Sequence, residues 1–211
     1  ELIDTGVFDG DRYFDVFIEY AKAGPDDILV RIEAINRGPE PAELHLLPTL
    51  WFRNTWSWEL DARKPRVSRD ETAEIAALKV YHHYYGDRWL YCEGKPDLLF
   101  TENETNAQKL FGVENGSSGV KDAINDNIIH GAKDAVYATE AGTKASAHYR
   151  ATVAPGQSMI VRLRLSDAAP AGGKARRTLP PPSRRRTPPP RRPRASRSWR
   201  SWRPRGATTQ S

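Results

Sequence analysis

The residues with the most evident chemistry lie in one short stretch, where three tryptophans fall within eight positions. This stretch, WFRNTWSW, combines the rings of Trp51, Trp56 and Trp58 with the polar groups of Arg53 and Asn54. Saccharide sites use such a mixture, because aromatic faces stack on sugar rings while Arg and Asn hydrogen-bond the hydroxyls. The simpler interpretation is that alternate rings pack inside the fold and Arg53 pairs with a carboxylate. We treat all five residues as candidate contacts to a saccharide or to another domain.

Carboxylates and amides gather further along the chain, around Asn125, Asp126, Glu104 and Asp122. Two carboxyl groups can act as acid and base on a glycoside, but this requires a set separation and one raised pKa, and the sequence shows neither. Asx-rich loops more often hydrogen-bond their own turns. We therefore expect no catalytic residue in this chain, and we keep Asn125 and Asp126 as candidate contacts only.

Histidine and cysteine indicate no metal site. The five histidines lack the spacing of a chelating pair, and the neighbours His82 and His83 are predicted to point to opposite faces of a strand. The single cysteine, Cys92, excludes a disulfide within the chain and a Cys-based zinc finger, and its apolar neighbours predict a buried small side chain. We expect neither a metal nor a cofactor.

The elements that must position these residues are strands, because most of the chain alternates apolar and polar residues with a period of two. Turn signals such as GPDD at 24–27 and APG at 154–156 separate neighbouring runs and predict hairpins. Pro48 predicts a bulge or edge point in its run. The predicted strands cover residues 13–21, 28–35, 42–52, 77–85, 89–93, 98–101, 145–153 and 159–165.

Two segments lack this pattern. Residues 57–78 are predicted to form a crossing loop, although 71–78 could make two helical turns, and residues 102–142 are predicted to form long loops with one short strand near 128–130. Since no helix of 10 to 12 residues alternates with the strands, the fold class is all-β, an antiparallel β-sandwich whose core the large rings could fill.

Charge divides the chain into two unlike parts. Residues 174–211 contain 13 Lys and Arg, 8 Pro and no Asp or Glu, which leaves 19 basic and 27 acidic residues, a net charge of −8, in residues 1–173. We expect a sandwich domain over 1–167 and a disordered Pro/Arg-rich tail over 168–211. Runs such as PPP and RRR are typical of a GC-rich gene read out of frame, so we interpret the tail as a frameshift product.

The two ends of the chain give further expectations. It begins with Glu1, which suggests a segment of a longer polypeptide. Neither a signal peptide nor an apolar run of about 18 residues is evident, so we expect a cytoplasmic location and no membrane partner.

Several motifs resemble the N-terminal region of large glucosidase-like proteins related to glycoside hydrolase family 63 and the mannosylglycerate hydrolases. The resemblance covers nearly all of residues 1–166. The motifs that carry it are Leu2–Phe8, Arg12–Val16, Asn36–Pro39, Leu46–Trp58, Leu99–Asn106, Val120–Asp126 and Gly142–Lys144.

This resemblance implies a supersandwich-like domain that precedes an (α/α)6 barrel, with the catalytic carboxylates of an inverting mechanism in the barrel. The chain would then be a non-catalytic sandwich domain of a truncated glycosidase, with the barrel and a saccharide as its partners. Two other classes stay open. One is a stand-alone carbohydrate-binding module, and the other is non-specific binding of nucleic acid by the basic tail.

Overall fold

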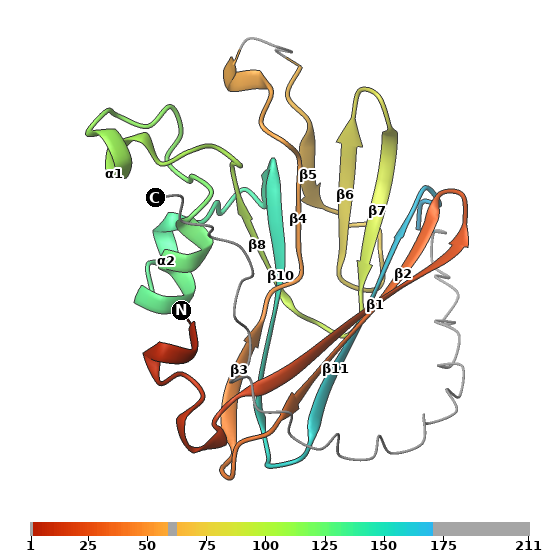
Figure 1. Ribbon diagram of the computed structural model, residues 1–211. Helices are drawn as coiled ribbons and strands as arrows, with labels where there is room; N and C mark the ends of the chain where they lie inside the picture. Colours follow the sequence, from red (N-terminus) through yellow and green to blue (C-terminus); the bar gives the residue numbers. More distant parts are fainter. Residues whose placement is uncertain (1, 59–62, 171–211) are drawn as a thin grey trace, which may run out of the picture. The chain divides into compact units, whose positions relative to one another are not determined.

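The computed structural model describes residues 2–58 and 63–170, with the side chains of residues 2 and 58 excepted. The predicted tail lies outside these ranges apart from residues 168–170, and so does its interpretation as a frameshift product. Two antiparallel sheets form the described part, which confirms the predicted all-β, sandwich-like fold (Figure 1).

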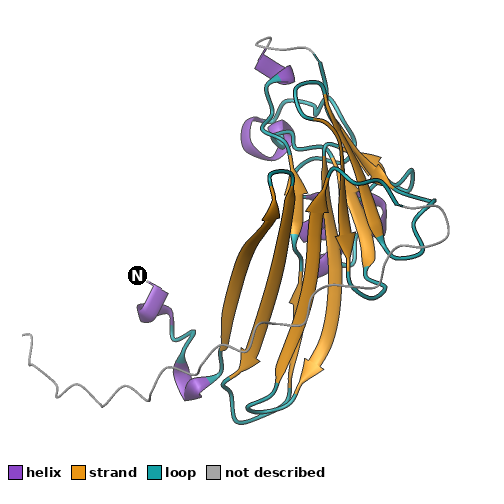
Figure 2. Cartoon of the chain, turned by 90° about the vertical axis from the view of Figure 1, so that its right-hand side faces the viewer, coloured by secondary structure: helices purple, strands orange, loops and turns teal. Residues whose placement is uncertain are grey.

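The larger sheet has seven strands in the order β1-β2-β11-β7-β6-β5-β9. Its long strands stand side by side when the chain is turned by 90° (Figure 2). The predicted first hairpin is confirmed, with Ile18 opposite Ile32, and β11 then pairs Val161 with Ile32. The strands of this sheet are β1 (Phe14–Gly24), β2 (Asp27–Asn36), β5 (Arg66–Arg69), β6 (Ala77–His82), β7 (Gly86–Cys92), β9 (Ala141–Gly142) and β11 (Ser158–Ser166).

The smaller sheet is built around β10 (Lys144–Val153). β4 (Thr49–Trp51) and β8 (Asp97–Thr101) lie on opposite sides of β10, because both pair with its residues 144–146. β3 (Ala42–Leu46) pairs with the second half of β10. The chain breaks between β3 and β4 at Pro48, as its missing N–H predicts.

Two predictions for the irregular segments are wrong. The segment 57–78 contains β5, which pairs with β6 and β9 inside the larger sheet. The segment 102–142 contains α1 (Ala107–Phe111) and α2 (Ala123–His130) where loops and a short strand were expected. The buried Val120, Ala123 and Ile124 follow the spacing of a helix face, and Gly131 ends α2 in the left-handed region with φ 67°.

Short 3-10 turns complete the described part. They are η1 (Leu2–Thr5), η2 (Asp9–Asp11), η3 (Trp56–Trp58) and η4 (Lys133–Ala135). Among the described residues, no helix is long and apolar enough to cross a membrane.

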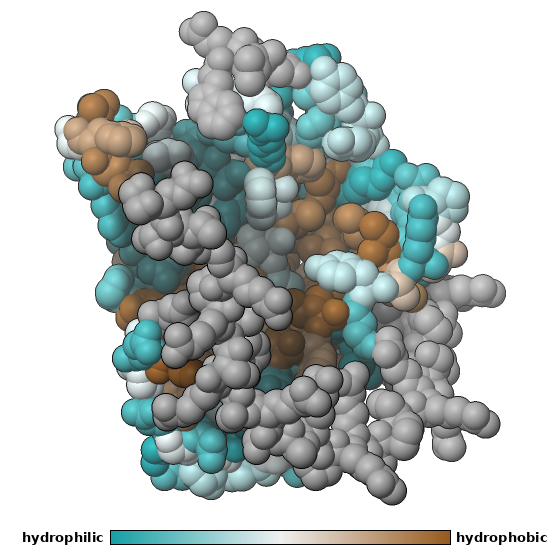
Figure 3. Space-filling model, in the orientation of Figure 1, coloured by the Kyte–Doolittle hydropathy of each residue, from teal (hydrophilic) through white to brown (hydrophobic). Residues whose placement is uncertain are grey.

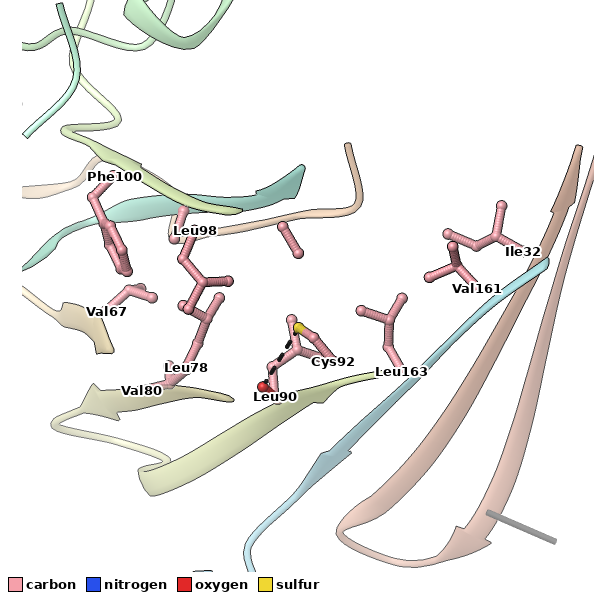
Figure 4. Close-up of a cluster of buried hydrophobic side chains, with 12 residues drawn as sticks. Ile32, Val67, Leu78, Val80, Leu90, Cys92, Leu98, Phe100, Val161 and Leu163 are labelled. Atoms are coloured by element: carbon pink, nitrogen blue, oxygen red, sulfur yellow. Dashed lines mark hydrogen bonds between the residues drawn. The ribbon is translucent and has the colours of Figure 1, made fainter. Parts of the chain in front are cut away.

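The core lies between the smaller sheet and the β5-β6-β7 part of the larger one, and it extends to Val161 and Leu163 on β11 and to Ile32 on β2 (Figure 4). Phe100, Val67 and Leu78 are fully buried there. Phe100 is the aromatic ring among the buried residues of this cluster, and Phe52, Tyr137 and Tyr149 pack against it, whereas Trp89 is buried outside the cluster. Cys92 is fully buried as predicted, and burial raises the pKa of its thiol to about 12.

The sandwich is open at one end. A cavity of about 250 Å³ lies between the end of β4 and the β1–β2 hairpin, with Leu50, Phe52, Ile28 and Leu165 among its lining residues. Apolar residues gather in the same hollow in Figure 3. The two sheets therefore cover each other only in part.

Candidate functional site

The tryptophan stretch is tied to the segment that follows β8. β4 ends at Trp51, and the next residue, Phe52, donates its N–H to the carbonyl of Thr143 at 3.3 Å. The side-chain amide of Asn103 donates to the carbonyl of Phe52 at 2.8 Å. The chain then turns into η3, and a common scaffold of β4, β8 and β10 holds both segments.

A network of carboxylates stabilises this junction. Trp56 donates its indole N–H to Glu104 Oε1 at 2.8 Å, and Lys64 Nζ lies 3.1 Å from the same oxygen. Lys64 also lies 3.1 Å from Oε2 of Glu102, whose side chain is only 13% exposed. The hydroxyls of Ser117 and Thr143 donate to Glu104 and Glu102 respectively. One ammonium group thus bridges two half-buried carboxylates.

The electrostatics of the network keep Glu104 and Lys64 charged. Burial alone would raise the pKa of Glu104, but the hydrogen bonds from Trp56 and Lys64 outweigh it, and the pKa is lowered. Burial would likewise lower the pKa of Lys64, but its two carboxylate partners raise it. A general acid at neutral pH needs a raised carboxyl pKa, so Glu104 is tuned in the opposite direction.

The five residues of the tryptophan stretch have different surroundings. Trp51 is 55% exposed and lies opposite Lys144 in the register of β4 and β10. Trp56 is half-buried in the network, and Arg53 is exposed. Asn54 caps η3, because its side chain accepts from the N–H of Ser57 at 3.0 Å and donates to the hydroxyl at 2.9 Å. Trp58 ends η3, and its side chain lies outside the described set.

Asn125 and Asp126 lie in the first turns of α2, where Asn125 is exposed and Asp126 is half-buried. The start of this helix reaches the network, since the N–H of Lys121 donates to the carbonyl of Glu104 at 3.0 Å. The amide of Asn106 also contacts both oxygens of Asp122, at 3.3 and 3.2 Å. The structure thus links α2 to the tryptophan stretch through the segment after β8.

Sequence reasoning missed Glu102, Lys64 and Gly142. Glu102 and Glu104 are two positions apart just after a strand, a spacing that can place both on one side, but nothing in the sequence connects them to Lys64. Gly142 is required by close packing, because a Cβ there would lie 2.3 Å from the carbonyl oxygen of Thr101. Only the close packing of β9, which pairs with β5, against the end of β8 explains why glycine is needed there.

The histidines also differ from expectation. β6 ends at His82, so His83 lies in the following turn and their rings stack, with centroids 4.4 Å apart. The prediction that they point to opposite faces is wrong, because the strand ends earlier than expected. Elsewhere, His45 Nδ1 and His148 Nε2 lie 3.0 Å apart on β3 and β10.

The fold defines this chain as an antiparallel, sandwich-like β protein with a tryptophan and carboxylate junction at one end of the smaller sheet. It is 33% identical over 182 residues to the Saccharomyces cerevisiae protein YMR196W, which is described as uncharacterized. The alignment covers 74% of this chain and 17% of the yeast protein, so the chain spans about a sixth of the length of this distant homologue. No family model matches.

Proposed function

We propose that this chain is a non-catalytic sandwich domain of a larger glycosidase-like protein. Its role would be to pack against an (α/α)6 catalytic barrel and to shape the saccharide site there. The observation that carries the proposal is the junction itself, where Lys64 bridges the carboxylates of Glu102 and Glu104, Trp56 hydrogen-bonds Glu104, and the exposed Trp51 ends the adjoining strand β4. Such a surface can bind and position a saccharide or a domain, but it offers no free acid and base.

Three further facts support a domain role. The chain corresponds to about a sixth of its yeast homologue, which leaves room for a catalytic domain in proteins of that length. The sequence motifs that resemble glucosidase-like proteins include both the tryptophan stretch and the segment with Glu104. Trp51 also lies on the same face of its sheet as Lys144, its partner in the register, and the Lys144 ammonium donates to the carbonyl of Lys121.

A hydrolysis assay separates this proposal from an enzyme. The chain should release no product from aryl glucosides or short α-glucosides above a buffer blank. Activity that is lost in Glu104→Ala or Asp126→Ala would contradict the proposal. The longer yeast homologue should hydrolyse such a substrate, and it should lose this activity when the segment that matches this chain is deleted. If the full-length homologue hydrolyses none of these glucosides, that result would equally contradict the proposal.

The exposure of Trp51 favours one alternative, a stand-alone carbohydrate-binding module. That alternative predicts saturable binding of a glucan or glucoside by the isolated chain, measured by titration calorimetry and abolished by Trp51→Ala. Trp89→Phe is a suitable control, because Trp89 is buried and hydrogen-bonds Asp70 at 2.7 Å. The domain proposal predicts no saturable binding at millimolar ligand, since the barrel would supply most of the site.

A further inference from the structure

The first strand presents an unusually open edge. β1 is the end strand of the seven-stranded sheet and has 11 residues without proline, and among the described residues it pairs only with β2. The strand at the other end, β9, has two residues. An unpaired edge of this length is a template for another strand, because its free N–H and C=O groups repeat along it.

Side chains on this edge are apolar and exposed. Val16, Phe17, Ile18 and Tyr20 are 49%, 50%, 53% and 74% exposed. Val16, Ile18 and Tyr20 lie on the inner face with Ile32 of β2, and Phe17 lies on the outer face. Contiguous exposed residues of this size are typical of an interaction surface.

The charges that commonly protect an edge strand are neutralised within the chain. Asp15 lies 2.7 Å from Arg37, and Glu19 lies 3.2 Å from Arg31 on β2. Neither carboxylate is left to repel an approaching strand strongly, although two of them placed opposite each other would still be unfavourable.

We propose that β1 pairs antiparallel with β1 of a second copy of this chain, with the two-fold axis at Ile18. If the two-fold axis is perpendicular to the sheet, the inner faces of both copies lie on the same side of the joined sheet. Each residue of β1 then faces a residue of the second copy whose number differs from its own by an even number of positions. Centring on Ile18 places Ile18 opposite Ile18 and Val16 opposite Tyr20 of the second copy. Phe17 then faces Glu19, and no two carboxylates face each other.

The neighbouring registers fit less well. Centring on Phe17 places Asp15 opposite Glu19, and centring on Glu19 places two glutamates face to face. Centring on Tyr20 places Lys22 opposite Ile18. Centring on Val16 brings no like charges together, but it pairs only residues 14–18 of β1. Like charges thus disfavour the registers on Phe17 and Glu19, and of the others the one on Ile18 pairs the most apolar side chains of β1 with each other. This self-complementarity is why a second copy is the occupant that we propose. The inference does not depend on the proposed glycosidase role.

Sedimentation of the full 211-residue chain tests the association. A dimer of about 48 kDa, twice the mass of 23.8 kDa, should form at micromolar concentration. Ile18→Lys, which places two ammonium groups face to face, should give the monomer mass. Ile129→Lys is the matched control, because Ile129 is 66% exposed on α2, and it should stay dimeric. A monomeric parent chain, or an Ile18→Lys variant that is still dimeric, overturns the proposal.

Cysteine cross-linking tests the register. Ile18→Cys should form an intermolecular disulfide rapidly with the oxidant diamide, since facing residues of a strand pair have Cβ atoms about 4.5–5.5 Å apart. Tyr20→Cys should cross-link at least tenfold more slowly, because it faces Val16, whereas the double variant Val16→Cys, Tyr20→Cys should match Ile18→Cys. The native Cys92 is buried and does not compete. Equal rates for Ile18→Cys and Tyr20→Cys would overturn the register.

Discussion

Two parts of the same sheet have the same sequence pattern and different surroundings. Leu78 and Val80 on β6 are 0% and 4% exposed, whereas Val16 and Ile18 on β1 are 49% and 53% exposed. Both pairs lie on the inner face with the alternation of a half-buried strand. The difference is that the smaller sheet covers β6 but not β1. Periodicity therefore defines an apolar face, and only the three-dimensional arrangement decides what covers it.

The largest expected loss of stability comes from truncating a side chain in the core, where the smaller sheet covers the larger one. Phe100→Ala should lower the free energy of unfolding by about 3–5 kcal/mol, because the fully buried ring leaves a cavity between the sheets. Phe17→Ala, the matched change on β1, should lower it by less than about 0.5 kcal/mol in dilute monomer. Urea unfolding of both variants measures the contrast, and similar losses would show that β1 is covered in solution.

A smaller loss of stability is expected when a side-chain atom is added to the tightly packed region around Gly142. Gly142→Ala should cost about 1–3 kcal/mol, because the new Cβ would lie 2.3 Å from the backbone carbonyl of Thr101, which cannot move without disturbing β8. Gly116→Ala is the control, since nothing lies within 4 Å of its added Cβ. Thermal unfolding compares them, and an unaffected Gly142→Ala would contradict the close packing of β9 against β8.

The carboxylate network should contribute about 1–2 kcal/mol, depending on pH. Glu104→Gln removes the charge that Trp56 and Lys64 contact, so it should destabilise the chain by this amount at pH 7. Because the folded pKa of Glu104 lies below its usual 4.5, the stabilisation is complete above that value and is lost as the pH falls through the folded pKa.

The wild-type advantage over Glu104→Gln should therefore shrink in acid. Glu74→Gln, a change on an exposed side chain, serves as the control and should have little effect at either pH. Urea unfolding at pH 7 and pH 3 measures both variants. A difference for Glu104→Gln that grows in acid would contradict the ionised, hydrogen-bonded state of this carboxylate.

The sequence predicts the strands well because their alternation is local. The hairpin of β1 and β2 and the break at Pro48 follow from turn residues and period alone. α2 was missed because it has only eight residues, and the helical spacing of its apolar residues Ala123, Ile124, Ile128 and Ile129 is clear only when Val120 is included.

The candidate site is predictable only in part. The tryptophans could be identified as functional candidates by composition, but their partners Lys64 and Glu104 are 40 residues apart in the chain. A long-range ion pair leaves no local pattern in the sequence. The same is true of Gly142, whose requirement arises from a neighbouring backbone rather than from its own turn.

Hydrogen exchange measured strand by strand tests most directly the claim that this sandwich has a covered part and an open part. In dilute monomer, amides of β6, β7, β8 and β10 should exchange only through global unfolding, because they surround the core. Amides of β1 that face the free edge should exchange at least about 100-fold faster, and this difference should shrink as dimer forms. Equal protection of β1 and β7 in the monomer would contradict the account.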